Sequence, residues 1–207
     1  MRLTRALAAG FMCVAVLGAS PAEAAPQEIK AKDIHKDAVV RYMRWAFERP
    51  APTGALIPEE CEVRGRNTFL PSTVTSNPAV VHDDCTAPAS KGFFAPVAVC
   101  FMFEDATLPR SELQNALRDC LFGEIGVQEF SATVDGQPVE LPRNRSFILP
   151  RPSEVDFFNG GEVSAVGGGW FFRIGPLPVG EHEIRLRVVF KDGFTSDVLT
   201  RVTVVPD

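Results

Sequence analysis

The stretch EHEIRLRVVF at residues 181–190, followed by the turn KDG at 191–193 and a second run at 196–205, decides the fold. In the first run the apolar residues Ile184, Leu186 and Val188 alternate with Glu183 and charged neighbours. This period of two is typical of a strand with one face in a core and the other in water. The Asp-Gly turn then predicts an antiparallel partner at 196–205.

Further strands are expected on either side of this pair. The hairpin signal Asp135-Gly136 joins runs at 129–134 and 138–141, and the continuous apolar run VAVCFMF at 97–103 indicates a strand buried on both faces. Other short runs lie at 145–149 and 170–174. Strands recurring with turns between them predict a mainly β fold, an immunoglobulin-like β-sandwich over residues 97–205.

Two helices are predicted beside the strands. Residues 33–48 carry an apolar stripe at helical spacing with charges opposite it, so we expect an N-terminal amphipathic helix capped by Asp33 and ended by Pro50. Residues 111–122 form a short additional helix, with Ser111 and Gln114 as a capping box and Gly123 as the stop. Both helices are expected to pack on the sheets.

The first 24 residues have the three parts of a secretory signal peptide. Arg2 and Arg5 precede an uncharged apolar run of 14 residues, and Ala22-Glu23-Ala24 matches the small-x-small cleavage pattern. The run is shorter than the roughly 20 residues that a membrane-spanning helix needs. We therefore expect cleavage after Ala24, a single mature domain at residues 25–207 without a membrane span, and a secreted or periplasmic location.

Removal of this leader leaves four of the five cysteines. An even number in an exported chain predicts two disulfides, and we favour Cys61–Cys85 and Cys100–Cys120 because each closes a local loop. The first bridge would hold the proline-rich segment at 50–95, where proline density argues against central strands. A zinc site is disfavoured because no Cys-x-x-Cys pair occurs.

The charge balance excludes one class of partner. The whole chain carries 21 basic and 26 acidic residues, and the leader takes away Arg2, Arg5 and Glu23, so the mature net charge is −6. Nucleic acids require clustered positive charge, so we expect no nucleic-acid partner.

Several segments together resemble a known family. They read CTxPAxKxxFxPV at 85–97, SATVDGxPV at 131–139 and GPLPVGEHEIRLRVVFKDGF at 175–194, after a helix that contains Trp45. The chain is similar here to a family of uncharacterised exported bacterial proteins with an immunoglobulin-like C-terminal β-region. The resemblance implies the fold and the export, and it transfers no catalytic residue.

No pattern indicates a catalytic, cofactor or metal site. His82-Asp83-Asp84 lacks the spacing of a calcium loop, His182-Glu183 lacks the second histidine of a zinc protease, and Ser164 lacks the glycine-flanked elbow of a serine hydrolase. Gly160-Gly161 and Gly167-Gly168-Gly169 are interpreted as turns because a strand follows them.

Aromatic residues provide the positive signal for binding. Neighbours on a strand face opposite ways, so Phe93/Phe94, Phe157/Phe158 and Trp170/Phe171 each send one ring outward unless both sheet faces are covered. The candidate binding surface is Trp170, Phe158 and Phe94. The favoured function is a non-enzymatic binding or envelope-associated module that recognises a protein or a glycan. The alternative is an extracellular hydrolase that uses an acidic cluster at Asp83/Asp84 or at Glu154/Asp156.

Overall fold

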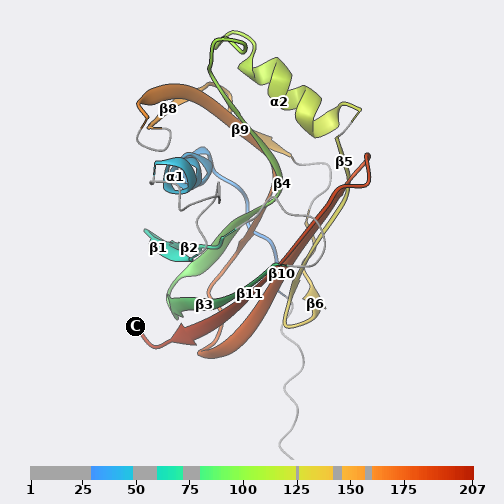
Figure 1. Cartoon of the computed structure of the whole chain (residues 1–207). Helices are drawn as coiled ribbons and strands as arrows, with labels where there is room; N and C mark the ends of the chain where they lie inside the picture. The colour runs from blue at the N-terminus through green and yellow to red at the C-terminus, as the bar shows by residue number, and fades with distance from the viewer. Residues whose placement is uncertain (1–28, 49–59, 72–79, 125, 142–145, 157–159) are drawn as a thin grey trace, which may run out of the picture.

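Two β-sheets pack face to face, with one helix outside the sandwich and another at its end (Figure 1). The computed structural model describes residues 29–48, 60–71, 80–124, 126–141, 146–156 and 160–207. The predicted signal peptide and its cleavage site lie outside these residues. Within them, no helix is long and apolar enough to cross a membrane.

Sheet A contains six of the described strands in the order β1-β2-β4-β9-β7, and β8 also pairs with β9. Their bounds are β1 Glu62–Arg64, β2 Asn67–Phe69, β4 Gly92–Phe103, β7 Phe147–Ile148, β8 Ser153–Asp156 and β9 Glu162–Ile174. The long antiparallel pair β4–β9 is the centre of this sheet.

Sheet B contains five of the described strands in the order β3-β11-β10-β5-β6. Their bounds are β3 Val80–Pro88, β5 Val127–Val134, β6 Gln137–Pro138, β10 Gly180–Phe190 and β11 Thr195–Val205. The expected strand pair is confirmed: β10 and β11 are antiparallel, and Ile184, Leu186 and Val188 are buried between exposed neighbours. The hairpin is also confirmed, with Asp135 and Gly136 at positive φ of 51° and 75°.

Both helices form as predicted, and Gly123 is the C-cap of the second as expected, but neither of the predicted N-terminal caps forms; Pro50 lies outside the described residues. Helix α1 spans Lys36–Phe47, so it begins three residues after Asp33, and its N-cap is His35 without a side-chain hydrogen bond. Helix α2 spans Leu113–Phe122 with Glu112 as its N-cap. Gln114 does not close a capping box, because its amide donates to the carbonyl oxygens of Leu149 and Pro150.

Phenylalanine rings fill the layers around sheet A. Phe69, Phe93, Phe94 and Phe172 are all fully buried. Helix α1 covers one face: the Tyr42 ring lies 5.7 Å from Phe94, and the Phe47 ring lies 5.2 Å from Phe101. Sheet B and α2 cover the other face, where the Trp170 ring lies 5.0 Å from Phe130 of β5 and 5.8 Å from Phe122 of α2. Figure 1 shows α1 and α2 on opposite sides of β4 and β9.

The two predicted disulfides are confirmed. Cys61–Cys85 joins the residue before β1 in sheet A to β3 in sheet B, so it ties the edges of the two sheets together. Cys100–Cys120 joins β4 to α2 and holds that helix on sheet A.

The described parts of the proline-rich segment, residues 60–71 and 80–95, contain more strands than expected. They include β1, β2, β3 and the start of β4, where the proline density argues against central strands; residues 50–59 and 72–79 lie outside the described residues. Pro88 ends an edge strand, and Pro96 lies beside a register shift between β4 and β9. These are the places where a sheet tolerates a residue without an N–H group.

The interpretation of Gly167-Gly168-Gly169 as a turn is wrong, because the triplet lies inside β9. A Cβ on Gly167 would meet the Phe101 ring at 2.6 Å, and a Cβ on Gly169 would meet the carbonyl oxygen of Ala98 at 2.1 Å. Gly169 also has a φ of +132°. The triplet is therefore required by close packing in the middle of sheet A, as is usual for glycine inside a strand. Gly160-Gly161 does lie in the connection between β8 and β9.

Candidate binding site

The predicted aromatic surface does not form from the residues proposed for it. Phe94 is fully buried and Trp170 is 9% exposed, so neither presents an open ring face. Phe158 lies outside the described residues. The alternative that helix α1 and the opposing sheet cover both faces of the strand pair is confirmed for Phe94 and Trp170.

Among the described residues, Phe122 is an exposed aromatic residue that the sequence pattern did not indicate. Phe122, the last residue of α2, is 47% exposed while its ring contacts Trp170. Its place one position beyond the apolar stripe of the helix is a signal that could have marked it. The other large apolar residues exposed on the described chain are Val63, Val81 and Val179. They lie in β1, in β3 and in the loop before β10, whereas Phe122 lies in α2.

The acidic cluster at Glu154/Asp156 is occupied by structural contacts. The hydroxyl of Ser164 donates to the Glu154 carboxylate at 3.0 Å, and Arg110 Nη1 donates to the same oxygen at 2.9 Å. Asp156 accepts the N–H of Gly161 at 3.2 Å. Ser164 is 3% exposed, so its hydroxyl is not presented to solvent as a nucleophile.

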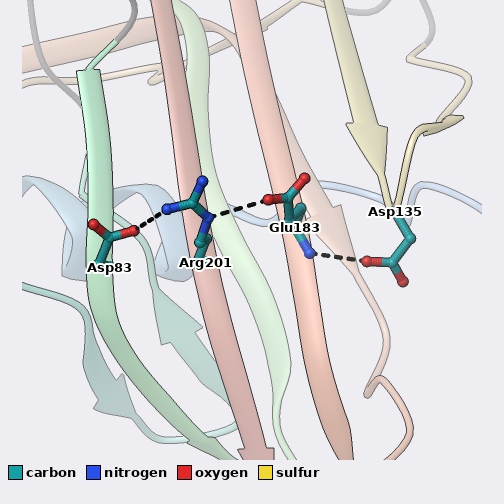
Figure 2. A network of polar contacts seen from close by, with 4 residues as sticks. All are labelled: Asp83, Asp135, Glu183 and Arg201. Carbon is teal, nitrogen blue, oxygen red and sulfur yellow. Dashed lines mark hydrogen bonds and ion pairs between the residues drawn. The ribbon is translucent and has the colours of Figure 1, made fainter.

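The second acidic cluster belongs to a ladder across the outer face of sheet B. Figure 2 shows Arg201 of β11 between Asp83 of β3 and Glu183 of β10, with N···O distances of 2.7 and 3.1 Å. Asp135 extends the row by accepting the main-chain N–H of Glu183 at 2.8 Å. The hydrogen bond to Glu183, followed by that to Asp83, raises the pKa of Arg201 above its ordinary value. Asp84 is exposed beside this row.

A concavity of about 410 Å³ opens at this ladder. It is lined mainly by side chains that already hold one another, including His182, whose Nδ1 lies 2.8 Å from Asp135 Oδ2 and whose Nε2 lies 2.9 Å from the carbonyl oxygen of Pro178. Among the described residues, no group of three or more His, Cys, Asp or Glu side chains is arranged to hold a metal ion. The ladder is therefore best explained as cross-strand ion pairing on the solvent face of a sheet.

A second cavity, of about 400 Å³, lies at the edge of sheet A and contains one of the predicted residues. We call it the β9-edge cavity. Its lining residues are Ala31, Lys32, Asp33, Ile34, Glu140, Leu141, Ser146, Phe147, Trp170 and Phe171. They come from the segment before α1, the chain after β6, and the strands β7 and β9.

The β9-edge cavity forms because the neighbours of β9 stop short of each other. Strand β7 pairs with β9 as far as Gly169, and the N–H of Lys32 donates to the carbonyl oxygen of Arg173 at 2.7 Å. Between these two contacts, no strand of the described chain pairs with residues 170–172 on this side. The main-chain N–H and C=O groups of successive strand residues point alternately to the two sides of the strand. On this side, the Gly167 carbonyl accepts the N–H of Leu149 and the Arg173 carbonyl accepts the N–H of Lys32. The main-chain groups of Phe171 point to the same side, toward the cavity.

The segment before α1 is held firmly against the sheet. Arg173 Nη1 donates to the carbonyl oxygen of Asp33 at 2.5 Å, and Ile29, Ala31 and Ile34 pack against the core. This fixes one wall of the β9-edge cavity, with Lys32 and Asp33 exposed at its rim. The opposite wall carries the exposed Glu140.

No protein-family model matches the chain, and no curated protein matches it significantly. The function must therefore be argued from the geometry of these sites.

Proposed function

We propose that the protein is an exported, non-enzymatic binding module that recognises a glycan or a partner protein in the β9-edge cavity. The observation that carries this proposal is the combination of apolar wall residues with exposed Lys32, Asp33 and Glu140 in one concave site. A cavity of about 400 Å³ falls within the volume range of small-ligand sites, which pair apolar walls with a few polar groups.

Export is supported by two independent features. The leader pattern at residues 1–24 predicts secretion. The two disulfides are typical of proteins that fold in an oxidising compartment outside the cytoplasm. A periplasmic and a secreted location are both consistent with these two features. We also propose that the sandwich has an immunoglobulin-like topology.

Binding is better supported than hydrolysis by the state of the acidic clusters. Glu154 and Asp83 each hold an arginine, and Ser164 is buried against Glu154. A general acid or base needs a group that can reach a substrate proton. Glu154 and Asp83 instead form hydrogen bonds to side chains of neighbouring segments, which is a structural role.

The test compares two blocked variants of the mature protein. Ala31→Phe fills the β9-edge cavity, and Thr203→Phe places the same ring at the exposed rim of the sheet B concavity. Immobilised wild-type and variant proteins are exposed to purified envelope polysaccharide and to envelope protein, with matching circular dichroism spectra as the check on folding.

The expected result is retention by the wild type and by Thr203→Phe, with retention lost in Ala31→Phe. Equal retention by all three proteins, or loss only in Thr203→Phe, would show that the β9-edge cavity is not the site. Absence of retention by the wild type would overturn the binding function itself.

A further inference from the structure

Resting on the proposed function, we infer that the β9-edge cavity takes a neutral saccharide. The first argument is size. The site is a single concavity of about 400 Å³, whereas a stable protein interface buries roughly 800 Å² on each partner, most of it in a contiguous patch. The large apolar residues exposed on the described chain are Val63 of β1, Val81 of β3, Phe122 of α2 and Val179 in the loop before β10.

The chemistry of the rim is the second argument. Asp33 and Glu140 carry carboxylates, which accept hydrogen bonds, and Lys32 carries an ammonium group, which donates them. Ser146 can do both. A sugar hydroxyl is both donor and acceptor, so a polyhydroxylated ring can satisfy acceptor-only and donor-only groups at once.

The apolar wall suits the other face of such a ring. Ile34, Leu141 and Phe147 are half-buried, and small accessible parts of Trp170 and Phe171 complete the wall. The C–H groups of a sugar are apolar and pack against carbon, while the main chain of Phe171 adds polar groups from the strand edge. Because the aromatic rings are mostly buried, the ligand contacts their accessible edges and does not stack along a whole ring.

Charge selects within the saccharides. Among the described lining residues, two carry a carboxylate and one carries an ammonium group, and the whole chain has a net charge of −5. An acidic sugar would meet like charge both locally and from the protein as a whole. Neutral sugars, with or without acetamido groups, meet no such penalty.

The experiment uses the indole N–H signals of the two tryptophans in ¹⁵N-labelled mature protein. Trp170 lines the β9-edge cavity, whereas Trp45 lies on the buried face of α1, where its indole N–H donates to Glu62 at 2.9 Å, so it is an internal control. The probes are a tetramer of β-linked glucose, a tetramer of N-acetylglucosamine and a tetramer of galacturonic acid. We expect at least one neutral tetramer to shift the Trp170 signal and the Lys32 amide while the Trp45 signal stays in place.

Two substitutions test the rim. Glu140→Gln removes one charged acceptor and should weaken neutral-saccharide binding about tenfold, since a hydrogen bond to a charged group contributes about 1.5 kcal/mol or more. The matched control is Glu181→Gln at the sheet B concavity, which should leave the affinity unchanged.

The outcomes separate the ligand class from the function. If no neutral tetramer shifts Trp170 but protein retention still depends on Ala31, the saccharide is wrong and the binding function stands. Preference for the galacturonate tetramer would also overturn the neutral class. If neither saccharide nor protein depends on the cavity, both proposals fail.

Discussion

Replacing Gly169 with alanine tests the central packing of sheet A. The residue has a φ of +132°, and an added Cβ would lie 2.1 Å from the carbonyl oxygen of Ala98 and 2.7 Å from the Cα of Val99. A side chain at positive φ costs about 1–3 kcal/mol, and overpacking against a backbone that cannot move freely costs about 1–3 kcal/mol more. The lower entropy of unfolded alanine offsets about 0.4–1 kcal/mol of this. We expect a net loss of about 3 kcal/mol in the free energy of unfolding.

The matched control is Gly180→Ala. Gly180 has a similar φ of +143°, but an added Cβ would meet nothing within 4 Å. The control therefore carries the conformational strain without the clash, and we expect a loss of about 1 kcal/mol.

Urea unfolding of both variants under non-reducing conditions, followed by circular dichroism, measures the difference. Two variants with equal midpoints would refute the argument that β4 approaches β9 too closely for a side chain. They would leave only the backbone strain that the two positions share.

Three further predictions concern one disulfide bridge and two aspartate side chains. Removing the Cys100–Cys120 bridge by paired alanine substitutions should cost about 3 kcal/mol in urea unfolding, because the bridge closes a loop with a sequence separation of 20. Asp197→Asn should cost about 1–2 kcal/mol by the same assay, since Asp197 is 8% exposed and accepts two hydrogen bonds from the half-exposed Arg185, whose pKa it raises. The hydrogen bond from the Ser90 main-chain N–H lowers the pKa of the Asp207 carboxyl from its ordinary value of 3.8. This bond should therefore stabilise the folded chain fully above pH 3.8. The stabilisation should be lost as the pH falls through the lower pKa that Asp207 has in the folded chain.

Each of these has a control. The mature double-alanine variant should take up no alkylating reagent without reductant, because its remaining cysteines Cys61 and Cys85 stay paired; alkylation of Cys85 would show that the second disulfide had also been lost. Glu129→Gln, at an exposed pair 3.8 Å from Arg187, should change stability by less than about 0.5 kcal/mol. For Asp207→Asn, a stability difference from the wild type that grows on acidification would contradict the assigned sign.

Local patterns were sufficient where the sequence repeats with the period of its element. The alternation at 181–190, the Asp135-Gly136 turn and the apolar stripes of both helices each reflect one strand or helix and the face it buries. The disulfide pairing was also predictable because both bridges join cysteines close in sequence.

Patterns failed where a distant neighbour decides the structure. The sequence alone suggests a turn for the glycine triplet. Only the structure shows that Phe101, Met43 and Ala98 lie too close to it to leave room for side chains. Gln114 reads as a cap unless the carbonyls of Leu149 and Pro150 are known to lie within its reach.

The sequence also indicated only part of the candidate site. Trp170 was picked out from the sequence, but as a ring facing outward, whereas it is a mostly buried wall of a cavity. Lys32 and Glu140 were not singled out, because exposed charges in irregular segments carry no periodic signal, and Asp33 was interpreted as a helix cap and not as part of a site. The hydrogen bond of Lys32 to Arg173 fixes one wall of the cavity, and its opening follows from the start of β7 at Phe147, opposite Gly169.

By itself, the sequence determined the elements that alternate or repeat, the mainly β class and the pairing of the cysteines, because each depends on residues within one element or one short loop. The tertiary structure alone decided which ring is covered, why three glycines lie in a central strand and where a cavity opens. Those features depend on how closely separate strands and helices approach, and that distance is set by side chains remote from one another in the sequence.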